Sequence, residues 1–132
     1  MPFTGLTILI VDDEEALRDI LAEDFRSLGA NVIEAKNGAT ALVQIKSHKC
    51  DAIITDLRMP GGDGLSLLRK IQYLKLPIEP KFFLCSGTDQ ISQDDIRSLN
   101  ISEVFEKPYN RRSLARTVAR ALGIADIDLT DF

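Results

Sequence analysis

Five short apolar segments, each followed by a longer stretch with helical periodicity, constrain the fold of this chain more than any other feature. They lie at residues 7–11, 31–35, 52–55, 81–85 and 103–106. Most are apolar throughout rather than alternating, which is typical of strands buried on both faces of a parallel sheet. Right-handed crossovers then place helices on both faces of that sheet. The sequence therefore predicts an α/β fold, a doubly wound parallel sheet of five strands with five flanking helices.

The helical stretches have recognisable faces and ends. In the first, spacings of three and four residues predict one buried face, made of Ala16, Leu17, Ile20, Leu21, Phe25 and Leu28. Gly29 follows and predicts the helix end, because glycine readily adopts the left-handed conformation of a C-terminal cap. Ser92 predicts the start of the fourth helix, and the fifth is expected to begin after Asn110 and to stop at Gly123.

Length and charge bound the domain organisation and the partners. With 132 residues, one domain is expected, formed by residues 1–123, with residues 124–132 as a C-terminal tail or the start of a linker. A net charge of −4 and a pI near 5.0 disfavour direct binding of nucleic acid. We find neither a signal peptide nor an apolar run long enough to cross a bilayer, so we expect a cytoplasmic protein that does not enter membranes.

Charged and polar residues follow four of the five apolar segments. Asp12 and Asp13 follow the first, Asp56 the third, Ser86 the fourth and Lys107 the fifth. Because the carboxyl ends of parallel strands meet at one edge of the sheet, we expect these side chains to gather there. Clustered carboxylates repel one another, and a hard cation such as Mg²⁺ relieves that repulsion.

The same cluster has the parts that phosphoryl transfer requires. Asp56 stands alone and is the candidate nucleophile, since a carboxylate can form an acyl phosphate. Lys107 can neutralise the oxygens of a phosphoryl group, and Ser86 can donate a hydrogen bond to them.

These motifs resemble the receiver domain of two-component response regulators over about residues 6–122. The matching segments are LIVDDEE, IITDLRMPGGDG, LCSG and FEKPYN. The resemblance implies a CheY-like, flavodoxin-like sheet in the order 2-1-3-4-5. It also implies that Asp56 accepts a phosphoryl group from a sensor histidine kinase or a histidine phosphotransfer protein. That Mg²⁺-dependent reaction would switch the binding of an output protein. The chain would not be an enzyme, and its only chemistry would be accepting the phosphoryl group and slowly removing it.

The resemblance also implies roles for individual residues. The Mg²⁺ ligands would be Asp12, Asp13, Asp56 and the backbone carbonyl of Arg58. Ser86 would be the switch hydroxyl, and Lys107 would contact the phosphoryl oxygens and precede a cis bond to Pro108. Arg58 and Thr88 would tune the lifetime of the phosphoryl group. A homodimer through the fourth helix, fifth strand and fifth helix is also compatible with the family.

The chain departs from the family pattern at three places. Gly62 replaces a methionine in GGDG, so we expect a mobile loop after the phosphorylation site. The switch hydroxyl is Ser86 rather than the commoner threonine, and Gly87 follows it. Val104 occupies the position of the aromatic switch residue, and its neighbour Phe105 is expected to point to the opposite face of the strand.

Other classes of protein fit less well. A phosphatase that forms an aspartyl phosphate through a D-x-D motif would need an acid at Arg58, and a nucleotide-binding switch would need a phosphate-binding glycine loop. Acids in the first turn would repel the phosphate of a bound flavin. The remaining alternative is a phosphorylation-independent binding scaffold of the receiver type.

Overall fold

The computed structural model describes residues 1–87, 91–125, 127 and 129, and its five strands form one parallel sheet. The strands are β1 Thr7–Val11, β2 Asn31–Ala35, β3 Ala52–Asp56, β4 Lys81–Ser86 and β5 Ile101–Glu106. Their order is β2-β1-β3-β4-β5, so β3 lies at the centre. Every residue of β3 is buried. The predicted fold class and strand order are therefore confirmed.

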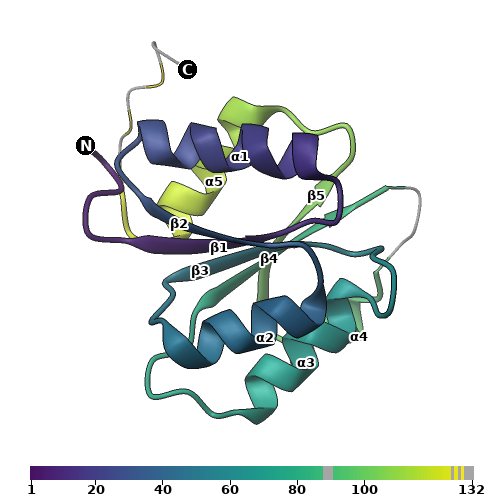
Figure 1. Cartoon of the computed structure of the whole chain (residues 1–132). Coiled ribbons are helices and arrows are strands. Elements are labelled where there is room, and N and C mark those ends of the chain that lie inside the picture. Colours follow the sequence, from purple (N-terminus) through teal and green to yellow (C-terminus); the bar gives the residue numbers. More distant parts are fainter. Residues whose placement is uncertain (88–90, 126, 128, 130–132) are drawn as a thin grey trace.

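Five helices cover the two faces of the sheet. They are α1 Glu15–Ser27, α2 Gly38–Ser47, α3 Gly64–Tyr73, α4 Gln93–Ser98 and α5 Arg111–Ala121. Figure 1 shows α1 and α5 on one face, and α2, α3 and α4 on the other. The ends follow the sequence signals: Gly29 has φ +97°, and the side chains of Ser92 and Asn110 cap α4 and α5.

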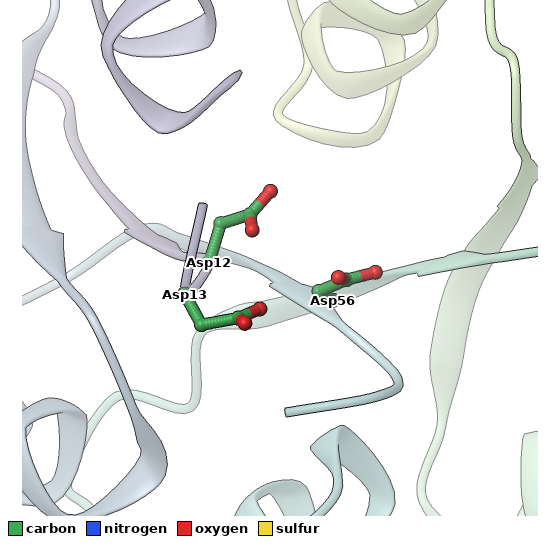
Figure 2. Close-up of side chains that lie close together, drawn as sticks. All are labelled: Asp12, Asp13 and Asp56. Atoms are coloured by element: carbon green, nitrogen blue, oxygen red, sulfur yellow. The ribbon is translucent and has the colours of Figure 1, made fainter. Parts of the chain in front are cut away.

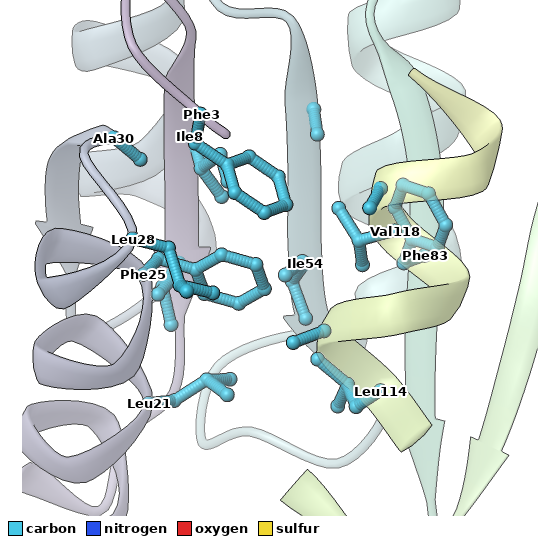
Figure 3. Packing of buried hydrophobic residues seen from close by; sticks show 14 of the residues in the cluster. Phe3, Ile8, Leu21, Phe25, Leu28, Ala30, Ile54, Phe83, Leu114 and Val118 are labelled. Carbon is cyan, nitrogen blue, oxygen red and sulfur yellow. The ribbon is translucent and has the colours of Figure 1, made fainter. Parts of the chain in front are cut away.

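Each face of the sheet has its own apolar core. The core under α1 and α5 contains a T-shaped contact between Phe3 and Phe25, with ring centroids 5.3 Å apart. Figure 3 shows Phe25 of α1 and Val118 of α5 on either side of Ile54, a residue of β3. The core on the other face is mainly aliphatic. Phe105 belongs to the first core and Val104 packs against the second, so the prediction that they face opposite ways is confirmed.

The predicted buried face of α1 is partly wrong. Leu17 and Ile20 are 40% and 44% exposed, and Ala16 is exposed as well. The first turns of α1 face the segment that follows β5 rather than the sheet, and Leu17 and Ile20 line a groove with Pro108. Periodicity identified the helix but could not indicate how far its apolar stripe extends beyond the sheet.

The C-terminal tail contacts the domain where the structure describes it. Ile124 and Ile127 pack against the core under α1 and α5, and Leu129 is buried within that core. Of the predicted tail, residues 126, 128 and 130–132 lie outside the described residues. Among the described helices, none has the length and apolar character needed to cross a membrane.

Candidate functional site

Three carboxylates meet at the carboxyl edge of the sheet. β1 and β3 are neighbours with Val11 opposite Thr55, so Asp12 and Asp56 leave the sheet side by side. One oxygen from each of Asp12, Asp13 and Asp56 lies within 4.8 Å of the others (Figure 2). Asp12 and Asp56 are each only 8% exposed. Oxygen ligands at this spacing fit a hard divalent cation such as Mg²⁺, which typically takes one or two carboxylates and completes its shell with water and phosphate oxygens.

Asp12 is held by its own backbone and by α1. Its Oδ1 accepts a hydrogen bond of 2.9 Å from the backbone N–H of Glu14, and its carbonyl accepts one of 2.8 Å from Arg18 Nη1. Arg18 also pairs with Glu34 of β2 at 3.2 Å. Burial raises the pKa of Asp12 above 3.8 and the charge of Asp56 adds to this, although the bond from Glu14 opposes it. A bound cation would therefore stabilise the ionised form of Asp12. Nothing in the sequence pattern indicates this supporting role of Arg18.

Lys107 supplies the positive charge beside the acids. Its Nζ lies 2.8 Å from Asp56 Oδ1, and its backbone N–H donates a 2.8 Å hydrogen bond to the carbonyl of Ser86. Burial alone would lower the pKa of Lys107, but its hydrogen bond to Asp56 and the charges of Asp56 and Asp12 raise it. The ammonium therefore stays charged at neutral pH. The peptide bond from Lys107 to Pro108 is cis, as predicted.

Backbone hydrogen bonds fix the position of Asp56. The N–H of Leu57 donates to the carbonyl of Cys85 at 2.8 Å, and the N–H of Gly64 donates to the carbonyl of Leu57 at 2.7 Å. A Cβ on Gly64 would meet the backbone oxygen of Asp56, so the start of α3 lies directly against the acceptor residue. The strand end and the helix start together hold Asp56 in place.

The other predicted site residues are placed as follows. Ser86 ends β4, is buried, and lies opposite Glu106 of β5 in the register. Arg58 is exposed and lines an open groove between the loop after β3 and the start of α4. Val104 is half-buried in β5. Thr88 lies outside the described residues, so its predicted role stays a prediction.

An apolar groove adjoins Lys107 on the α1 side. Leu17 and Ile20 form one wall, and Pro108 and Tyr109 form the other. Burial raises the pKa of the Tyr109 phenol, so the ring is neutral at physiological pH. The helical periodicity predicts Leu17 and Ile20 to be in the core, so this groove could not be predicted from it. The only indication in the sequence is that the apolar face of α1 is longer than the part of the helix that the sheet can cover.

Comparisons with known proteins agree with this geometry. The sequence model of the response regulator receiver domain matches residues 8–119. The chain is 29% identical over 126 residues to the phosphate regulon transcriptional regulatory protein PhoB of Pseudomonas aeruginosa, covering 92% of this chain and 55% of that protein. It is 28% identical over 115 residues to sporulation initiation phosphotransferase F of Bacillus subtilis, covering 87% of this chain and 92% of that protein.

The solved structures include a CheY-like response regulator receiver domain from Methylobacillus flagellatus. It has a TM-score of 0.79 and 26% identity, and the match covers 89% of this chain and 98% of that one. The chain spans 55% of the length of PhoB, about half, but most of the length of the phosphotransferase and of this receiver domain.

Proposed function

Because this chain belongs to the response regulator receiver domain family of two-component systems, we propose that it is a phosphoacceptor and that Asp56 is the residue phosphorylated. The observation that carries the proposal is the environment of Asp56. Its carboxylate is buried, lies 2.8 Å from the Lys107 ammonium, and shares an edge of the sheet with two further acids. The arrangement pairs one nucleophile with a fixed cation and a cluster of oxygen ligands.

The proposed reaction transfers a phosphoryl group from a phosphohistidine of a sensor histidine kinase or phosphotransfer protein. A carboxylate oxygen of Asp56 attacks the phosphorus as the bond from phosphorus to the imidazole nitrogen breaks. The electron pair of that bond stays on the imidazole, which takes up a proton from solvent. Lys107 balances the charge on the phosphoryl oxygens, and Ser86 donates a hydrogen bond to one of them.

Mg²⁺ is the cofactor that the acids fit. Asp12, Asp13 and Asp56 would hold it, with the backbone carbonyl of Arg58 as a further ligand. When bound, the ion supplies positive charge to the phosphoryl oxygens and lowers the repulsion among the carboxylates. Asp12 and Asp13 contribute by keeping their oxygens beside Asp56 before any donor arrives.

The groove beside Lys107 supports docking of the donor protein. Leu17 and Ile20 are exposed apolar side chains of α1, and the groove that they line includes Lys107, the partner of Asp56. A helix of the donor that covered them would bury apolar surface and bring its phosphohistidine towards the acceptor. The proposed partner therefore binds across α1 and the segment after β5.

The output of the switch is proposed to lie elsewhere on the domain. Phosphorylation would draw Ser86 and Lys107 towards the phosphoryl group, with Arg58 and Thr88 tuning its lifetime, and would alter the face formed by α4, β5 and α5. That face would bind an output protein or a second copy of the chain. Val104, rather than an aromatic side chain, lies on this path, so we propose a backbone shift as the signal.

The broader setting follows from the same proposal. We place the protein in the cytoplasm, where the buried thiols Cys50 and Cys85 would remain reduced. We propose residues 1–123 as the receiver and 124–132 as its tail or linker. Its chemistry would be limited to accepting the phosphoryl group and losing it slowly to water.

Mass spectrometry of the intact protein tests the proposal. Incubation with acetyl phosphate and Mg²⁺ is expected to add one phosphoryl group, and Asp56→Asn is expected to abolish the adduct. Asp63→Asn is the matched control, because Asp63 is an exposed acid of the same loop and asparagine can replace it as the cap of α3.

The contrary outcomes are also clear. A folded wild type that gains no adduct would favour the phosphorylation-independent scaffold. An adduct that persists in Asp56→Asn but disappears when EDTA removes Mg²⁺ would place the acceptor on another residue of the acid cluster.

A further inference from the structure

Asp24 is a buried acid on the side of α1 that faces the core. It is 6% exposed, and its neighbours along this face include Leu21, Phe25 and Leu28. An ionised carboxylate in such surroundings is costly unless it is paired. The apolar periodicity of α1 does not include Asp24, so its burial requires an explanation.

Arg111, the first residue of α5, is the partner of Asp24. Its Nε lies 2.7 Å from Oδ2 of Asp24 and its Nη2 lies 2.5 Å from Oδ1. The hydrogen bond to Asp24 raises the pKa of Arg111 further above its usual range. This two-point geometry fixes orientation as well as distance. It joins α1 to the start of α5 across 87 residues of sequence. Figure 3 shows apolar residues of the same two helices, among them Phe25 and Leu114, in one core.

The pair lies at one end of the segment that carries Lys107. At the other end, the Lys107 N–H donates to Ser86 and its ammonium contacts Asp56. Between them, Tyr109 packs against the core under α1 and α5, and Asn110 caps α5. The segment 107–110 is therefore anchored to the site at its start and to α1 at its end.

We propose that Asp24 and Arg111 are positioning residues for phosphoryl acceptance. Their ion pair fixes the start of α5 against α1, and this keeps the short segment before α5 in the conformation that holds Lys107 at Asp56. The Arg111 side chain is 51% exposed, and an ion pair with one solvent-exposed partner contributes little net stability. Its effect is therefore expected mainly in the placement of Lys107. The kinetic part of this inference rests on the proposed function; the structural part does not.

Two measurements on the full chain test the pair. The first is hydrogen exchange of the Lys107 amide without any phosphodonor, with the amide of Gly64, the first residue of α3, as the internal reference. The second is the rate of phosphorylation by acetyl phosphate with Mg²⁺. Arg111→Met removes the pair, Arg111→Lys keeps the charge but loses the two-point geometry, and Asp24→Asn removes only the charge of the carboxylate.

The expected result is local. Arg111→Met should speed exchange at Lys107 about tenfold while leaving Gly64 unchanged, and should lower the phosphorylation rate about three- to tenfold. Arg111→Lys should recover part of both effects. Asp24→Asn should reproduce the result of Arg111→Met, and it is the deciding variant if Arg111→Met does not fold.

Val118→Ala is the matched control, because it weakens the core of α5 without touching the pair. It should lower the melting temperature but leave the Lys107-to-Gly64 exchange ratio and the phosphorylation rate near wild type. If Arg111→Met and Asp24→Asn affect that ratio no more than Val118→Ala does, the pair is only structural and the proposal is overturned. A wild type that takes no phosphoryl group refutes the proposed function instead, and the exchange data alone then decide the positioning role.

Discussion

The loop after β3, residues 57–63, and the segment after β5, residues 107–110, serve the same site but are built differently. The β3 loop contains Gly61 and Gly62 with φ of +83° and +148°, and a Cβ at either position would meet nothing within 4 Å. The β5 segment is tied to Ser86 and Asp56 at its start and is followed at once by the pair between Arg111 and Asp24.

This difference indicates where the site needs precision. The β5 segment delivers an ammonium to a buried carboxylate, and the strength of that interaction depends steeply on distance in a partly buried setting. The β3 loop is proposed to deliver only a backbone carbonyl, from Arg58, and its middle has room to adjust. Its two ends are nevertheless fixed, because the N–H of Leu57 and the N–H of Gly64 both donate to backbone carbonyls.

Removing the charge from the anchored segment should have the largest effect. Lys107→Met leaves Asp56 without its 2.8 Å cationic partner, so phosphorylation by acetyl phosphate should slow about 100-fold. Arg58→Met retains its backbone carbonyl and should slow the reaction only about threefold by the same reasoning. Initial rates from intact-mass time courses measure both. Equal losses in the two variants would contradict the contrast between the loops.

The β3 loop should itself divide into a tight end and an open middle. A Cβ on Gly64 would lie 2.8 Å from Leu84 Cδ1 and closer still to the carbonyl oxygen of Asp56, so Gly64→Ala should destabilise by about 3 kcal/mol. A Cβ on Gly61 would meet nothing within 4 Å, so Gly61→Ala should destabilise the fold only by the cost of a left-handed conformation, about 1 kcal/mol. Urea unfolding measures both, and similar values would show that the loop is uniformly constrained.

The acids should impose a cost on the fold when no cation is bound. Burial and the charge of Asp56 raise the pKa of Asp12 above 3.8, so its ionised form disfavours the folded state. Without Mg²⁺ at neutral pH, Asp12→Asn should therefore stabilise the fold by about 1 kcal/mol.

The pH dependence has a definite sign. The folded state binds more protons at Asp12 than the unfolded state does, so the advantage of Asp12→Asn is full above the raised pKa. It disappears as the pH falls towards 3.8. Melting curves in EDTA from neutral pH down to about pH 3.8 measure the stability advantage of Asp12→Asn. An advantage that grows with acidity would contradict this prediction.

The smallest effect concerns motion. The backbone order parameters of Gly61 and Gly62 should fall below about 0.7, while those of Lys107 and Tyr109 should stay near 0.85. NMR relaxation of the unphosphorylated protein provides the values. Equal order parameters in the β3 loop and the β5 segment would show that the β3 loop is not the more mobile of the two.

Most of the fold could be predicted from the sequence because its signals are local and agree with one another. Short apolar runs rich in β-branched residues, such as residues 7–11, are typical of strands buried on both faces of a sheet. Gly29 marks a helix end by its backbone conformation, and Asn110 marks a helix start by its capping side chain. The acids and Lys107 could be grouped because parallel strands bring their carboxyl ends to one edge. These inferences need no knowledge of how distant helices pack.

The errors and omissions all concern contacts between distant elements. The exposure of Leu17 and Ile20 depends on where the segment after β5 passes α1. The pairing of Asp24 with Arg111 depends on how α5 packs against that helix. Arg18 binds the Asp12 carbonyl and also pairs with Glu34 of β2, so its role depends on where α1 lies relative to β1 and β2. A single sequence contains the residues for these contacts but not the geometry that pairs them.

Locating the phosphoryl group is the most direct test of the central claim, that Asp56 is the acceptor. The protein is treated with acetyl phosphate and Mg²⁺, and the acyl phosphate is reduced with borohydride, which converts a phosphorylated aspartate to homoserine. Tandem mass spectrometry of the peptides then identifies the converted residue. We predict homoserine at position 56 and unmodified aspartate at positions 12, 13 and 63. Homoserine at any of those three positions, with position 56 unchanged, would contradict it.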